Sequence, residues 1–154
     1  MKNKLVLTCS FILVFALSAF AQNQAALVKD KDPELAKNKK LVYDFWREVF
    51  EGGHMELAPK YMAESYIQHN PNVPTGRQAF VDFFSKFAVA KPAVDTIKAP
   101  VIAITADGSL VTLVFKQENP DPKDPAKKYT TTWFDMFRIE NGKIAEHWDP
   151  ALKR

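Results

Sequence analysis

The sequence contains a single cysteine, Cys9, which lies in an apolar segment at the start of the chain. If that segment is removed, as its pattern suggests, the remaining protein can form no disulfide and has no thiol nucleophile. Disulfide-stabilised scaffolds and cysteine-dependent enzymes are thereby excluded. A hydrophobic core must then provide the stability, and a chain of this length is large enough to build one.

Long apolar runs are lacking outside the first 21 residues. The apolar stretch 5–15 is short for a membrane span, which needs about 20 residues. Lys2 and Lys4 precede it, and the small residues of Ala19-Phe20-Ala21 follow it, as in a secretory signal peptide. We therefore expect residues 1–21 to be cleaved near Ala21/Gln22, and the protein to be periplasmic or secreted and free of the membrane afterwards.

An excess of charge of one sign is absent too. The full chain carries a formal net charge of +3, and the predicted leader contains two lysines and no acidic residue, so its removal leaves +1. Such a balance, without a basic stripe, is not typical of a nucleic-acid-binding protein. No internal repeat is present. We expect one domain over 33–154, after a flexible polar arm at 22–32.

The first half of that domain has the pattern of helices. Asp32-Pro33 is typical of a helix start, an N-cap acid followed by proline. Apolar residues recur at helical spacing from there to Gly52-Gly53, where the helix should end; they are Val42, Phe45, Trp46, Val49 and Phe50. A short second helix is expected over 54–62. A third should begin with a capping box at Thr75 and carry four aromatic residues on one face: Phe80, Phe83, Phe84 and Phe87.

The second half has the pattern of strands. A brief strand at 66–68 runs into His69-Asn70-Pro71, and strands at 97–106 and 110–117 flank the turn Asp107-Gly108. The segment 119–128 is rich in proline and charge. It predicts either a solvated connection or a rim or lid over a cavity.

The last hairpin, 129–149, carries ionisable groups between aromatic residues, and its turn lies at Asn141-Gly142. One register that fits the sequence has a two-residue loop, in which Glu140 pairs with Lys143. Asp135 and His147 then point to opposite faces of the sheet. Periodicity alone leaves this register open.

The other register has a type I turn with Gly142 in a left-handed bulge position, so that Ile139 pairs with Lys143. Asp135 then lies opposite His147. A slip of one residue moves every side chain to the other face, so the two registers predict different sites. This second register gathers one set on a single face: Trp133, Asp135, Phe137, His147 and Asp149.

Helices followed by antiparallel strands indicate an α+β layout. The segments YIQHNP…TGRQAF and FDMFRIENGKIAEHWD resemble the SnoaL-like polyketide cyclase group of the nuclear-transport-factor-2-like superfamily, over about Pro33 to Asp149. The resemblance implies a cone-shaped α+β barrel, with three N-terminal helices packed on a strongly curved, mostly antiparallel sheet around a pocket. It also implies a homodimer and favours the bulged register, because the pocket needs both strands to point the same way.

The resemblance implies the acid–base aspartate at Asp149 and a polar pocket position at Asp135, and it puts a pocket asparagine near His69-Asn70. An aspartate in water is a poor base, but burial beside aromatic rings and a second carboxylate raises its pKa. We therefore expect Asp149 to be the general base and acid, Asp135 and His147 its partners, and His69 a group that polarises a substrate oxygen. The expected substrate-binding residues are Trp46, Tyr66, Asn70, Trp133 and Phe137.

These residues predict an exported enzyme that acts by acid–base chemistry on a small, largely apolar carbonyl compound, as an aldol-type cyclase, isomerase or dehydratase. It should need no cofactor and no metal. One alternative is a binding protein of the same fold without catalysis, and another is a module used only for dimerisation. A metal hydrolase could use His69, His147 and a carboxylate, but no His-Glu-x-x-His or similar spacing is present.

Overall fold

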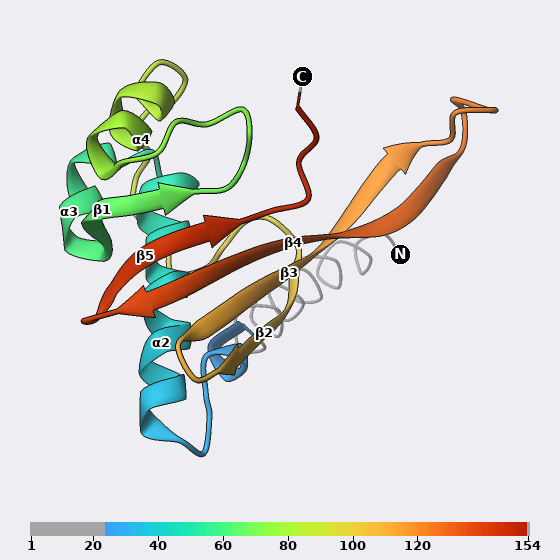
Figure 1. Ribbon diagram of the computed structural model, residues 1–154. Coiled ribbons are helices and arrows are strands. Elements are labelled where there is room, and N and C mark those ends of the chain that lie inside the picture. Colours follow the sequence, from blue (N-terminus) through green and yellow to red (C-terminus); the bar gives the residue numbers. More distant parts are fainter. Residues whose placement is uncertain (1–23, 154) are drawn as a thin grey trace, which may run out of the picture.

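The computed structural model describes residues 24–153, so the predicted leader and its cleavage site lie outside the described residues. One five-stranded sheet has the order β1-β5-β4-β3-β2. Its strands are β1 (Met62–Gln68), β2 (Val101–Asp107), β3 (Leu110–Pro120), β4 (Lys128–Glu140) and β5 (Lys143–Trp148). Strand β1 runs parallel to β5, and the other neighbours are antiparallel. The sheet is curved, and the helices lie on its concave side (Figure 1).

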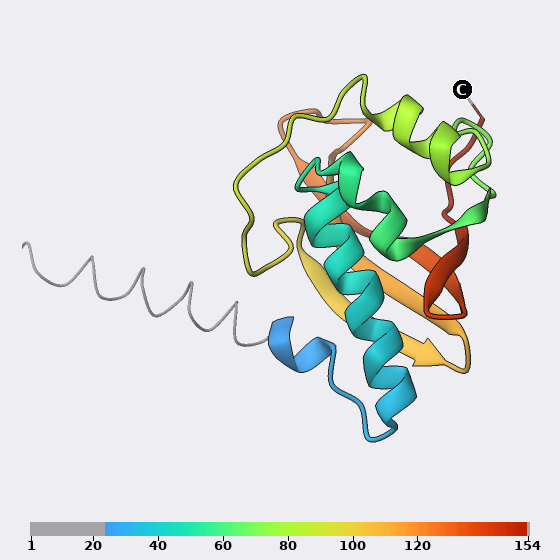
Figure 2. The same cartoon turned by 90° about the vertical axis from the view of Figure 1, so that its left-hand side faces the viewer.

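The longest helix, α2 (Pro33–Phe45), crosses the concave face of the sheet (Figure 2). The side chain of Asp32 accepts hydrogen bonds from the backbone N–H groups of Glu34 and Leu35, which confirms the predicted helix start. The helix continues as a π-helical turn, Trp46–Phe50, and a 3₁₀ turn, Met55–Leu57, leads into α3, Ala58–Tyr61. Helix α4, Arg77–Phe84, covers the end of the sheet near β1 (Figure 1). The predicted α+β fold is therefore confirmed.

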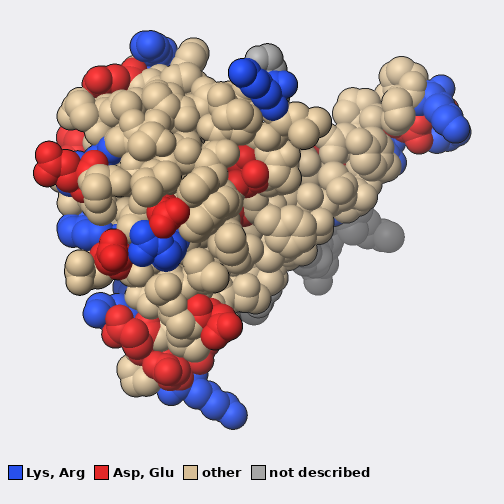
Figure 3. All heavy atoms as spheres, viewed as in Figure 1, with Lys and Arg blue, Asp and Glu red and all other residues tan. Residues whose placement is uncertain are grey.

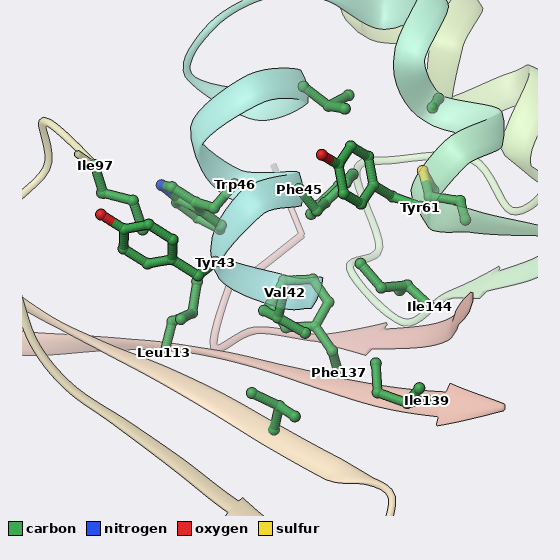
Figure 4. Close-up of a cluster of buried hydrophobic side chains, with 14 of the residues drawn as sticks. Val42, Tyr43, Phe45, Trp46, Tyr61, Ile97, Leu113, Phe137, Ile139 and Ile144 are labelled. Carbon is green, nitrogen blue, oxygen red and sulfur yellow. The ribbon is translucent and has the colours of Figure 1, made fainter. Parts of the chain in front are cut away.

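The core lies between α2 and the concave face of the sheet (Figure 4). Val42 and Val49 have no exposed surface, and Phe45 packs edge-on against Phe137 of β4 with ring centroids 6.0 Å apart. All residues of the predicted apolar stripe except the last one therefore face the sheet. Phe50 is 39% exposed and lies at the edge of this core.

Two expectations for the third helix are wrong. The N-cap of α4 is Gly76 rather than Thr75, and the Thr75 hydroxyl instead accepts a hydrogen bond from the backbone N–H of Gln68. Phe87 lies beyond the end of α4 and is 72% exposed, because the helix stops three residues earlier, at Phe84. Phe80 is buried as expected.

The segment expected to be a flexible arm is fixed to the domain from its first described residue. Gln24 is buried, and its side-chain amide donates to the carbonyl oxygen of Ile97 at 2.9 Å. Its amide oxygen accepts from the backbone N–H of Ile97 and from the Tyr43 hydroxyl. Satisfied buried hydrogen bonds of this kind hold the segment in place. The expectation of a loose arm was wrong for this part.

The register of the last hairpin differs from both of the registers expected from the sequence. Glu140 pairs with Lys143 across a two-residue loop, so the expected pairing of Ile139 with Lys143 is wrong. The pairing shifts beyond this point, however, because Arg138 lies opposite Glu146 and the extra residue Ala145 forms a bulge on β5. From Arg138 on, moving away from the turn, each residue of β4 therefore lies opposite a β5 residue two positions further along than in the bulged register. A shift of two keeps every side chain on its face, so Asp135 and His147 still point to the same side.

The turn itself has positive φ angles at both central residues, 51° at Asn141 and 70° at Gly142. This is the pattern of a type I′ turn, which matches the twist of the flanking strands. A Cβ at Gly142 would meet no atom within 4 Å, so only the backbone conformation opposes a larger residue there. Gly142→Ala should therefore lower the free energy of unfolding by about 1 kcal/mol in urea denaturation. Asn141→Gly is the control and should not destabilise the protein. A Gly142→Ala variant as stable as the wild type would contradict the type I′ turn.

Strands β3 and β4 extend beyond the body of the domain as a two-stranded ribbon (Figure 1). Pairing continues out to Pro120 opposite Lys128, so the predicted loop 119–128 is shortened to the connection 121–127. No helix in the described part of the chain is long and apolar enough to cross a membrane.

Candidate active site

A cavity of about 550 Å³ lies between the concave face of the sheet, the π-helical turn after α2, and α4. About half of its lining residues are aromatic, and the residues of this aromatic wall are Phe45, Trp46, Phe50, Tyr66, Phe80, Phe84, Phe115, Trp133 and Phe137. Polar groups come mainly from β1, β4 and the end of β5, and they are Gln68, Asn70, Asp135, His147 and Asp149. Lys116 and Gln117 reach the cavity from the base of the ribbon, but no residue of 119–128 lines it.

Asp135 and His147 form a buried pair. His147 Nε2 lies 2.9 Å from Asp135 Oδ1. His147 is 8% exposed and Asp135 is 4% exposed. They meet because His147 lies opposite Phe137, two residues along β4 from Asp135, which is a diagonal contact within reach of long side chains. The His147 ring also packs on Phe137 with centroids 4.7 Å apart. The predicted contact of these two ionisable residues is therefore present, although the register that was expected to produce it is not.

Burial raises the pKa of Asp135 above the usual range of an aspartic acid, although the hydrogen bond and the charge of His147 oppose the shift. The second carboxylate, Asp149, raises the pKa of Asp135 further. Asp135 Oδ2 is buried and has no partner of good hydrogen-bond geometry among the described residues, although the nearby side chain of Trp133 slightly lowers the pKa of Asp135. A proton shared within the Asp135–His147 pair reduces the cost of burying this carboxyl group.

Asp149 follows the end of β5 and is held by two donors. Its Oδ2 accepts from the Asn70 side-chain amide at 2.7 Å, and its Oδ1 accepts from the backbone N–H of Ala151 at 2.8 Å. The Asn70 amide is itself fixed, because its oxygen accepts from the backbone N–H of Asn72. The two donors orient the carboxylate, and both leave lone pairs of Asp149 free for a ligand.

Tyr66 contributes a hydroxyl group at the same end of the cavity. It is 2% exposed, and its oxygen accepts a hydrogen bond from the Gln68 side-chain amide at 2.9 Å. Burial raises the pKa of the Tyr66 phenol far above its usual value, and the charges of Asp149 and Asp135 add to this shift. No described group accepts the hydroxyl proton of Tyr66, so a bound ligand can accept it.

His69 does not approach this group, and its expected role was wrong. Its ring stacks on Trp148 at 4.6 Å, and its Nε2 lies 2.9 Å from Glu146 on the outer side of the sheet. Alternation along β1 explains the placement, since Tyr66, Gln68 and Asn70 point inward and the residues between them point outward. The other predicted residues of the site line the cavity: Trp46, Tyr66, Asn70, Trp133, Asp135, Phe137, His147 and Asp149.

Sequence reasoning missed Gln68 altogether. It pairs with His147 across β1 and β5, and its Oε1 lies 2.8 Å from His147 Nδ1. The spacing of two residues from Tyr66 was a usable signal, because residues two apart on a strand share a face.

Three of these residues have the composition of a cation site. One ligand atom each from Asp135, His147 and Asp149 lies within 4.8 Å of the others. Both ring nitrogens of His147 already contact oxygen atoms, one of Asp135 and one of Gln68. A cation bound by His147 would therefore have to replace its contact with Asp135 or its contact with Gln68. The arrangement fits a hydrogen-bonded acid–base group better than a set of metal ligands.

Comparison with solved structures finds the same fold. A candidate SnoaL-like polyketide cyclase from Jannaschia sp. CCS1 has a TM-score of 0.55 and 15% identity, covering 79% of this chain and 91% of that chain. A candidate polyketide cyclase from Acidithiobacillus ferrooxidans has a TM-score of 0.53 and 20% identity, covering 73% and 86%. An LEH-like epoxide hydrolase of M. tuberculosis has a TM-score of 0.52 and 12% identity, covering 76% and 84%. Identities this low establish the fold alone.

A search of curated proteins gave no match. The model of one family, described as SnoaL-like polyketide cyclase, matches residues 40–151, a span that includes most of the helical part, the whole sheet and every residue of the cavity described above. This agrees with the resemblance inferred from the two sequence segments. The chain belongs to the SnoaL-like polyketide cyclase family.

Proposed function

We propose that the protein is an exported enzyme that uses acid–base chemistry, without a cofactor, on a small and largely apolar carbonyl compound. The observation that carries the proposal is the placement of Asp149 beside the Asp135–His147 pair in one aromatic cavity, with ligand atoms of all three within 4.8 Å. Export rests on the signal-peptide pattern of residues 1–21.

Asp149 takes a proton from the carbon next to the substrate carbonyl, and the electron pair moves to form an enolate. The hydroxyl of Tyr66 donates a hydrogen bond to the enolate oxygen, the role first expected of His69. In a cyclisation the enolate carbon attacks a second carbonyl, and the new alkoxide takes up a proton. In an isomerisation the proton returns to a different carbon. Both reactions use the same base and donor, and the aromatic wall binds the apolar part of the substrate.

Proton exchange tests this function even though the natural substrate is unidentified. The protein is incubated in D2O with a panel of apolar β-diketones and β-keto esters, and deuterium next to the carbonyl is measured by NMR. Binding is followed through the fluorescence of Trp46 and Trp133, which line the cavity. Exchange above the buffer rate supports an acid–base enzyme. Binding of several compounds with no exchange would favour the alternative of a binding protein without catalysis.

We also propose that two copies associate through the outer face of the sheet. Few charged side chains lie on the part of this face that leads toward the β3–β4 ribbon (Figure 3), and the exposed apolar residues of the sheet include Ile102 and Phe134, at 53% and 45%. A face with few charges and several exposed apolar side chains is typical of an interface. We expect a dimer in sedimentation at micromolar concentration, and Phe134→Glu should shift it toward the monomer. A wild-type monomer under these conditions would contradict the proposal.

A further inference from the structure

The side chain of Gln68 joins three parts of the site. Its Oε1 accepts from the backbone N–H of Asn70 at 3.0 Å and contacts His147 Nδ1 at 2.8 Å, while its Nε2 donates to the Tyr66 hydroxyl at 2.9 Å. A backbone N–H can only donate, so the atom facing Asn70 must be the amide oxygen. The orientation of the Gln68 amide is therefore determined by the main chain.

This orientation determines the protonation of His147. The Gln68 oxygen cannot donate, so His147 Nδ1 must carry a proton to make the 2.8 Å contact. A neutral His147 with its proton on Nδ1 has a lone pair on Nε2. That lone pair would face a second lone pair on Asp135 Oδ1 at 2.9 Å, unless one proton lies between the two atoms. Either Asp135 is protonated or His147 is doubly protonated.

We propose that Gln68 is a positioning residue that fixes the tautomer of His147 and so keeps one proton in the Asp135–His147 pair. This pair is then the acid that protonates the product oxygen, while Asp149 acts as the base, and the proton that Asp149 has taken passes back to the pair before the next turnover; this division of roles rests on the proposed function. The tautomer itself does not depend on any reaction.

The surroundings of the pair are consistent with a retained proton. Asp135 is buried and its second oxygen has no partner of good hydrogen-bond geometry among the described residues, which disfavours the ionised form. Other titratable groups that line the cavity around the pair are Asp149 beyond β5, Tyr66 on β1 and Lys116 on β3. Asp149 is already held by Asn70 and Ala151, so His147 and Asp135 have each other as their nearest ionisable partners.

Gln68 also leaves the proton of Tyr66 available. Because the Gln68 amide donates to the Tyr66 oxygen, it cannot accept from the same hydroxyl group. The proton of Tyr66 must point elsewhere, and no described group accepts it. One side chain thus sets both the tautomer of His147 and the donor direction of Tyr66.

The imidazole ¹⁵N and ¹³Cδ2 NMR signals of the purified protein test this directly. The chain has 3 histidines, and the signals missing in His147→Gln identify His147. We expect a proton on Nδ1 in the wild type near pH 7, with or without a second on Nε2. A neutral ring protonated at Nε2 alone would overturn the proposal. Asp149→Asn should leave the tautomer unchanged, so a failure of the proposed function is distinguished from a failure of this inference.

Two substitutions separate the effects of Gln68. Gln68→Met removes the acceptor and should give a mixture of tautomers or Nε2–H, with exchange slowed on the order of 10²-fold and KM changed less. Gln68→Glu keeps an acceptor for Nδ1 and should preserve the wild-type tautomer, but its carboxylate can accept the Tyr66 proton and should slow exchange as Tyr66→Phe does. Gln78→Met on the exposed side of α4 is the matched control. An unchanged tautomer in Gln68→Met, or a changed one in Gln68→Glu, would contradict the role of Gln68.

Discussion

Asp149→Asn should lower kcat for deuterium exchange by about 10³- to 10⁴-fold while leaving ligand affinity within a few-fold of the wild type. An amide has nearly the shape of a carboxylate but cannot accept the proton. One of its two hydrogen bonds, from Asn70 or from Ala151, would face an NH₂ group instead of an oxygen. We therefore expect a loss of about 1 kcal/mol in the free energy of unfolding. Stopped-flow binding and NMR exchange on the same samples separate the two effects.

The control for this substitution is Glu146→Gln, the same change of a carboxylate to an amide on the outer side of β5. Glu146 contacts His69 and Arg138 and does not line the cavity, so exchange should continue at the wild-type rate. Exchange by Asp149→Asn within tenfold of the wild type would show that Asp149 is not the base. The Asp135–His147 pair would then be the next candidate for that role.

The fold could be predicted because its signals are local and repeated. Asp32 caps a helix whose apolar residues recur at helical spacing, and Asn141-Gly142 forms the tight turn that such a dipeptide favours. The capping box predicted at Thr75 does not form, because a tertiary contact uses its hydroxyl group. The Thr75 hydroxyl is used by Gln68 of β1, a contact between residues seven apart that local pattern does not reveal.

The register of the last hairpin could not be predicted correctly because a bulge in the middle of a strand has little sequence signal. Ala145 is the extra residue, and both it and Ile144 are buried. In a regular strand two adjacent residues cannot both face the core. The adjacent apolar pair was the one available sign of the bulge. Asp135 and His147 came together despite the wrong register because the two-residue difference preserves which face each side chain occupies.

The errors at His69 and Gln68 have a different cause. His69 was chosen for its chemistry, although alternation from the buried Tyr66 places it outward and places Gln68 and Asn70 inward. Gln68 carries no charge and cannot titrate, so a search for acid–base residues passes over it. Its importance comes from hydrogen bonds between β1 and β5, which are distant in sequence and parallel in space.

Tyr66→Phe should lower kcat for exchange by about 10²- to 10³-fold, since it removes the one uncharged donor that we place at the enolate oxygen. The negative charge on that oxygen develops in the transition state, so KM should change much less than kcat. Because burial raises the pKa of the Tyr66 phenol, the hydroxyl stays protonated well into the alkaline range, and its donor role should be undiminished to about pH 10, the usual pKa of a phenol. An alkaline loss of activity below that pH must therefore come from another group.

Tyr43→Phe is the matched control, because Tyr43 is a buried tyrosine whose hydroxyl bonds to Gln24 outside the cavity. Tyr66→Phe removes the hydrogen bond from Gln68, and Tyr43→Phe removes one hydroxyl proton shared between Gln24 and the carbonyl oxygen of Asp95. Each change should cost about 1 kcal/mol of stability, so thermal denaturation should not distinguish them. Only Tyr66→Phe should slow exchange. Equal rates for the two variants would mean that Tyr66 does not bind the substrate oxygen. The proton held between Asp135 and His147 would then be the group that stabilises the developing negative charge.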